Sequence, residues 1–76
     1  AVDIDGTVQI DGATTFGVDD TGVDVKFFGA TSGAYALWDE SADDLILAGA
    51  AGLIVPDGKL TLASTAVTST AAELNQ

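Results

Sequence analysis

The stretch GVDVKFFGATSGAYALWDESADDLIL, residues 22–47, holds every aromatic residue of the chain except Phe16. Two apolar runs, Val25–Phe28 and Ala34–Trp38, flank a glycine-containing turn, which predicts a β-hairpin with a five-residue loop. An acidic segment, residues 39–44, leads into a third apolar run, Leu45–Leu47. We therefore expect three short strands here, with the rest of the chain added before and after them.

The chain is small and has no covalent or metal staple. It has 76 residues, no cysteine and no histidine, so a disulfide and the common soft-metal sites are ruled out. A chain of about 60 residues buries only about 60% of its unfolded surface. Small domains of this kind usually need a disulfide, a metal or a partner chain. We therefore expect the missing core to come from further copies of the same chain.

The large side chains of the first two runs are the candidates for an interface between copies. Successive side chains of a strand point to opposite faces, and here both faces of each run carry apolar residues. Such double-sided runs predict burial on both sides, which one small chain does not provide. The interface candidates are Phe27, Phe28, Tyr35, Leu37 and Trp38.

Residues 1–18 form a repetitive β segment by their pattern. Apolar residues or glycine occupy every even position except 14, and polar residues occupy most odd ones, as in a strand with one buried face. A six-residue repeat places an Asp-Gly pair in each copy, and hairpins at both pairs would leave strands of only about three residues. We therefore predict the short sides of a β-solenoid or of an interchain β-prism.

The chain after residue 47 has a different character. Segment 48–52 is either a close approach of three backbones around an axis or an ordinary loop. Residues 53–55 and 59–63 are predicted strands on either side of a turn at Pro56. Thr70 and Glu73 match a capping box, so a helix should begin at Thr70. We assign residues 19–66 to a β module with the aromatic core and residues 67–76 to a linker or truncated helical cap.

The charge of the chain restricts its partners. Twelve acidic residues stand against Lys26 and Lys59, giving a formal net charge of −10. Nucleic acid is not an expected partner because phosphate binding needs clustered Lys and Arg. Anionic membrane surfaces are disfavoured for the same reason, and no run reaches the roughly 18 apolar residues of a membrane helix. Repulsion between copies is tolerable in a saline extracellular setting, where salt screens it.

Catalytic chemistry is not expected. The paired acids at residues 19–20, 39–40 and 43–44 lie in predicted turns, and the chain offers no room for the sugar cleft that glycosidase carboxylates need. Without histidine or cysteine, no other common catalytic set can be assembled. We predict that the chain is not an enzyme and that it has no cofactor.

Calcium and sugars are the ligands that the residues leave open. Asp3, Asp5 and Asp11, or the acids of residues 39–44, offer the oxygen atoms that calcium prefers. Their spacing is neither that of an EF-hand loop nor that of the calcium-binding nonapeptide repeat, so we favour solvated acids and no metal site. Trp38 and Tyr35 could stack on a sugar, but their apolar neighbours favour a role in the core.

Two segments resemble parts of structural fibre proteins of tailed bacteriophages. Residues 22–29, GVDVKFFG, and residues 32–45, SGAYALWDESADDL, are similar to a module that recurs in such proteins, especially those of marine and cyanobacterial phages. Residues 67–75, VTSTAAELN, resemble the threonine-alanine-glutamate-leucine-asparagine repeats of the same proteins. Because the chain does not begin with Met and stops abruptly at residues 74–76, we expect it to be a fragment or a processed piece of a longer protein.

The resemblance implies a virion structural protein, a segment of a tail or neck fibre or appendage that supports host attachment. The expected fold is all-β, with short strands in an intertwined trimeric, β-prism or β-helix-like fibre segment and the start of a short C-terminal helix. The implied partners are two further copies and other virion proteins, and the implied location is the virion, outside the cell. The alternative is a calcium-dependent extracellular adhesin or binding module. No residue role is carried over from the resemblance.

Overall fold

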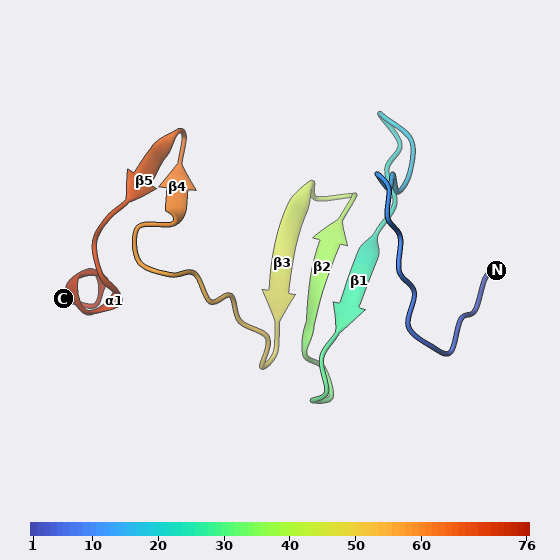
Figure 1. Cartoon of the computed structure of the whole chain (residues 1–76), viewed down its shortest axis with the longest axis horizontal. Helices are drawn as coiled ribbons and strands as arrows, with labels where there is room; N and C mark the ends of the chain where they lie inside the picture. The colour runs from blue at the N-terminus through green and yellow to red at the C-terminus, as the bar shows by residue number, and fades with distance from the viewer.

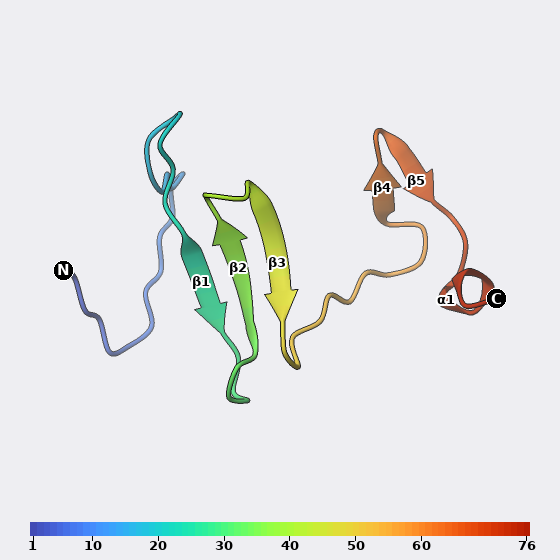
Figure 2. The ribbon, with the colours of Figure 1, turned by 180° about the vertical axis from the view of Figure 1, so that it is seen from behind.

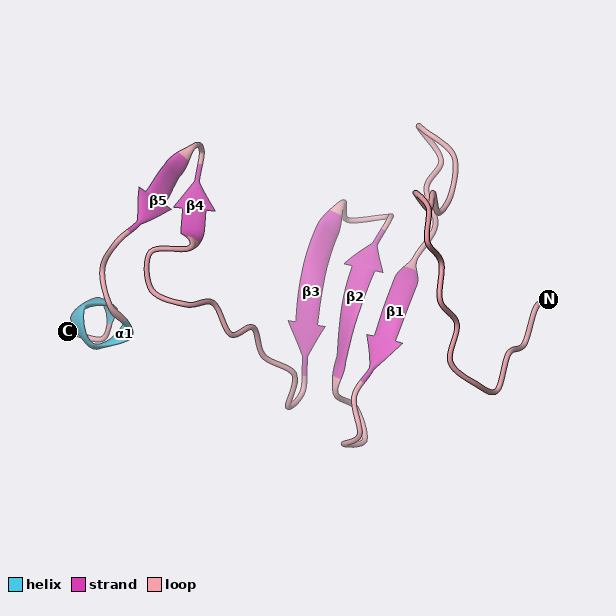
Figure 3. Cartoon of the chain, viewed as in Figure 1, coloured by secondary structure: helices cyan, strands magenta, loops and turns pink.

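The computed structural model describes all 76 residues of the chain, and its regular elements are short. Their bounds are β1 Val25–Phe28, β2 Tyr35–Asp39, β3 Asp44–Ala48, β4 Leu60–Leu62, β5 Thr65–Val67 and α1 Ala71–Leu74 (Figures 1 and 3). The strands form two antiparallel sheets, ordered β1-β2-β3 and β4-β5. The expectation of mainly β structure with one short helix is therefore confirmed.

The three-stranded sheet is the predicted hairpin extended by one strand. β1 pairs with β2 and β2 pairs with β3, so that Phe27 lies opposite Ala36, and Ala36 lies opposite Leu47. The strands predicted at residues 25–28, 34–38 and 45–47 are confirmed to within one residue at each end. Local apolar runs and turn residues were sufficient to locate these elements.

Glycines permit a close approach at one end of this sheet. The Gly29 N–H donates to the Ala34 carbonyl oxygen at 2.8 Å and closes the β1–β2 loop. Gly49 follows β3 with a φ of +61°, and a Cβ atom at this position would lie 2.5 Å from the Gly33 carbonyl oxygen. Within one chain, Gly49 and Ala50 thus form a turn directly after β3, and Gly49 packs on the chain's own β1–β2 loop.

The second sheet is a hairpin with a two-residue turn. Ala63 and Ser64 have φ values of +49° and +71°, as in a type I′ turn, whose twist matches that of the flanking strands. The strand predicted at residues 59–63 is confirmed as β4. The sequence did not predict β5, because Ala-Ser is not one of the residue pairs that normally signal this turn.

The helix begins where the sequence predicts it. The Glu73 N–H donates to the Thr70 hydroxyl oxygen at 3.2 Å, and the Thr70 N–H donates to the Glu73 carboxylate at 2.8 Å. These reciprocal bonds form the expected capping box. The bonds from Thr70, chiefly from its backbone N–H, lower the pKa of Glu73.

Two of the predicted strand regions are not strands. Residues 1–18 and residues 53–55 have no strand assignment, although their apolar patterns favour one. No backbone N–H or carbonyl of residues 1–17 bonds to another backbone group of the chain. A strand is defined by a hydrogen-bonded neighbour, and in a single chain neither segment has one. The apolar pattern of each segment is that of a strand, but a pattern does not supply the neighbouring strand to which the segment would have to pair.

The chain is extended and exposes most of its side chains. The two sheets stand apart, and the N-terminal segment leaves the first sheet on the opposite side (Figures 1 and 2). No Cα atom of one sheet comes within 8 Å of the other sheet. The radius of gyration is 16.2 Å, against about 11 Å for a compact domain of this length. Ala34 is the one residue that is buried.

Candidate functional site

The first sheet has one face without a polar side chain. The register aligns its side chains in two rows across the strands, Val25–Trp38–Leu45 and Phe27–Ala36–Leu47. We call these six residues the apolar face. Phe27 and Leu45 are each about two-thirds exposed, and Trp38 and Leu47 are about two-fifths exposed. Such a continuous set of exposed apolar side chains is typical of an interaction surface.

The opposite face of the same sheet carries charges and is partly covered by its own residues. It comprises Lys26, Phe28, Tyr35, Leu37, Asp39, Asp44, Ile46 and Ala48, and we call it the mixed face. The Lys26 ammonium nitrogen lies 4.4 Å from the Tyr35 ring centroid and 5.4 Å from that of Phe28. The two rings meet edge to face at 6.2 Å. Lysine and aromatic side chains therefore stabilise this face within one chain.

The structure divides the five predicted interface residues between these two faces. Phe27 and Trp38 lie on the apolar face, whereas Phe28, Tyr35 and Leu37 lie on the mixed face. Tyr35 and Leu37 are half-buried, while Phe28 remains three-quarters exposed. The structure adds Val25, Ala36, Leu45 and Leu47 to the first pair. The alternation within each run predicts which residues share a face of that strand. The pairing register then shows which faces of the neighbouring strands lie on the same side of the sheet.

Acidic loops gather at the other end of the sheet. The Glu40 N–H donates to Asp24 Oδ1 at 2.9 Å, which ties the β2–β3 loop to the segment before β1. Asp39 Oδ1 accepts bonds from the Ser41 hydroxyl at 2.7 Å and from the Ser41 N–H at 3.1 Å. The hydroxyl bond is the larger cause of the lowered pKa of Asp39. These carboxylates therefore act as local caps of the loop.

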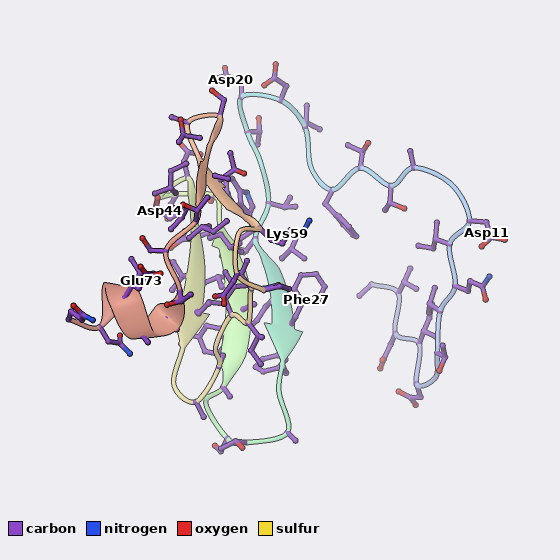
Figure 4. All side chains as sticks on the ribbon, turned by 60° about the vertical axis from the view of Figure 1, so that its left-hand side comes forward. Asp11, Asp20, Phe27, Asp44, Lys59 and Glu73 are labelled. Atoms are coloured by element: carbon purple, nitrogen blue, oxygen red, sulfur yellow. The ribbon has the colours of Figure 1, made fainter.

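A hollow of about 450 Å³ lies between these loops. Its lining includes Trp38 and four acids, Asp19, Asp20, Glu40 and Asp43. No group of three or more potential ligand side chains converges closely enough to hold a metal ion. Figure 4 shows the same dispersal for the labelled acids, with Asp11 on the N-terminal segment, far from Asp20 and Asp44. The hollow is thus an acidic depression with one aromatic wall.

A second, smaller hollow lies beside the helix. It has a volume of about 100 Å³ and lies between α1 and the β4–β5 hairpin. Its apolar lining includes Val55, Leu60, Val67 and Leu74. One isolated turn of helix is not stable in water, and the interaction that holds α1 in the structure is its capping box.

The hydroxyl and the carboxylate that pair within the chain are those of Ser41 and Asp39. The hydroxyl–carboxylate pair of Ser41 and Asp39 lies in an exposed loop and serves the turn. What the arrangement can do is present an apolar sheet face bordered by acidic loops.

None of the helices in the structure combines the length and the apolar character needed to cross a membrane. Comparison of the chain with protein-family models, with curated proteins and with solved structures gives no match.

Proposed function

We propose that this chain is a structural segment of a trimeric fibre or appendage of a tailed-bacteriophage virion. Its role is to hold a shape and span distance in support of host attachment, without catalysis. It acts outside the cell, together with other virion proteins. In the assembled fibre, the short strands of three chains form an intertwined β-prism or β-helix-like segment.

The exposed surface is the observation that carries this proposal. The chain exposes 6663 Å², whereas a folded monomer of 7.6 kDa exposes about 4,300 Å². The backbone forms 22 internal hydrogen bonds, against roughly 50 in a folded domain of this length. Both shortfalls favour a chain that completes its core and its sheets with neighbouring copies.

Three further features support a fibre over other oligomers. The principal extents of 48 × 31 × 28 Å describe an elongated chain. The paired β segment at residues 22–45 and the segment at residues 67–75 both resemble fibre proteins of tailed phages. The high acidic content suits a protein that works in salt outside a cell.

Sedimentation of the purified chain, with calcium and with a chelator, tests the proposal. We expect a species of three times the 7.6 kDa chain mass at micromolar concentration, unaffected by the chelator. A folded monomer would overturn the trimer. An assembly that dissociates on chelation would favour the calcium-dependent adhesin instead.

A further inference from the structure

We infer that copies of this chain contact one another through the apolar face of the first sheet, and that the mixed face stays outside the contact. The inference rests on the proposed function for the existence of an oligomer. It goes further by assigning the contact to one of two faces that are formed by the same three strands. Its occupant is a second copy of this chain.

Charge selects between the two faces. The mixed face carries Lys26, Asp39 and Asp44, and burying it against another chain would place these charges in an environment of low polarity. The apolar face has no charged or polar residue in either row. Burying it releases apolar surface from water without a desolvation cost for charged groups.

Charge also selects the occupant. A basic partner would be drawn to the acidic hollow beside Trp38, at the edge of the apolar face, whereas the six residues of the face itself carry no carboxylate. A second copy brings the same uncharged, apolar surface, so that each apolar face removes the other from water. In a two-fold contact the same patch of both copies meets, whereas in a three-fold ring one part of the face of each copy meets a different part of the face of the next.

The shape of the face suits packing against itself. Ala36 is the smallest residue in its row and lies between Phe27 and Leu47, which leaves a low place in the centre. Trp38 is the largest residue in the neighbouring row and lies between Val25 and Leu45. With sheets packed about 10 Å apart, Trp38 of one copy can fill the low place over Ala36 of the next.

The chain as a whole leaves surface exposed that further copies can cover. The chain exposes about 2,400 Å² more than a compact monomer of its mass. A standard interface buries about 800 Å² on each partner, so two neighbours in a ring would take about 1,600 Å². This excess is spread over the whole chain, so the apolar face supplies one part of each contact and other exposed segments supply the rest.

Two substitutions with the same chemistry test the assignment. Phe27 on the apolar face and Phe28 on the mixed face are adjacent, and they are 65% and 75% exposed. Phe27→Asp should weaken assembly by roughly a hundredfold or more in sedimentation, because each contact would bury a carboxylate. Phe28→Asp makes the same change in charge beside Lys26 and should leave the mass of the assembly unchanged. The assignment would be overturned if Phe28→Asp alone loses assembly, or if both variants stay assembled.

A second experiment avoids variants that fail to fold. The chain has no cysteine, so Ala36→Cys and Ala48→Cys each introduce one thiol, on the apolar and the mixed face respectively. A short bifunctional thiol reagent should link Ala36→Cys chains into covalent oligomers and leave Ala48→Cys chains single. The reverse pattern would overturn the assignment. A monomeric wild-type chain would overturn the proposed fibre as well, whereas a chelator-sensitive oligomer linked through Ala36→Cys would overturn the fibre alone.

Discussion

The first sheet and the N-terminal segment have equally clear β patterns, but only one of them forms strands within the chain. Residues 25–48 pair in three antiparallel strands, while residues 1–17 form no backbone hydrogen bond with the chain. The difference lies in the connections. The first sheet has a loop closed by Gly29 and a loop capped by Asp39, whereas the Asp-Gly pairs of the N-terminal segment leave too little strand between them.

This contrast separates two kinds of information in a sequence. Alternation states which side chains share a face, and it does so in both regions. Pairing also requires a neighbour, and a neighbour within the chain requires a turn that brings it back in register. Where the turn is missing, the same pattern leaves an unpaired segment that another copy can complete.

The strongest way to break the first sheet is to add one methyl group at Gly49. Its φ is +61°, and the new Cβ of Gly49→Ala would lie 2.5 Å from the Gly33 carbonyl oxygen. We expect a loss of about 2–3 kcal/mol in the free energy of unfolding, from steric overlap and an unfavourable backbone conformation together. Urea unfolding followed by circular dichroism measures this loss.

Gly52→Ala is the matched control for this substitution. Gly52 lies three residues further on, has no positive φ, and has no atom within 4 Å of the place that a Cβ would take. It should change the unfolding free energy by less than about 0.5 kcal/mol. Equal effects of the two variants would show that the close approach of the two loops does not limit stability.

Most of the fold follows from the sequence, and the exceptions have physical causes. The three central strands, β4 and the capping box at Thr70 were predicted from local residues alone. β5 was not predicted because its turn uses Ala63 and Ser64 at positive φ, where Asn-Gly is usual. The strand at residues 53–55 was predicted wrongly, because an apolar run alone does not specify a pairing partner.

The candidate site was predictable in composition but not in arrangement. The five aromatic and leucine candidates come from the two correct strands, yet they fall on opposite faces of the sheet. The faces became distinct only with the register, which pairs Val25 with Trp38 and Phe27 with Ala36. The contribution of Leu45 and Leu47 depends on a third strand whose register no local pattern specifies.

Amide hydrogen exchange sharpens the comparison between the two regions. In a dissociated chain such as Phe27→Asp, the amides of residues 2–16 should exchange at unprotected rates. The amide of Leu37, in the central strand of the first sheet, should exchange more slowly. If the N-terminal segment pairs between copies, its amides should gain at least about tenfold protection in the wild-type assembly. Equal, unprotected exchange in both states would contradict an interchain role for this segment.

The smallest expected effect concerns the acidic loop. Crowding of like charges favours raised carboxyl pKa values, but the bonds from Ser41 lower the pKa of Asp39. Because the pKa of Asp39 is lower in the folded than in the unfolded state, its contribution to stability is present above the unfolded pKa. That contribution is lost as the pH falls through the folded pKa.

Ser41→Ala removes the hydroxyl bond, which is the main cause of the lowered pKa. The pKa of Asp39 should therefore rise toward its ordinary value, and acid should weaken the loop at a higher pH. Carboxyl chemical shifts of Asp39 measured against pH test this, with Ser32→Ala in the β1–β2 loop as the control. An unchanged titration in Ser41→Ala would mean that backbone donors alone hold the carboxylate, and an equal shift in the control would mean that the loop responds to any loss of a hydroxyl.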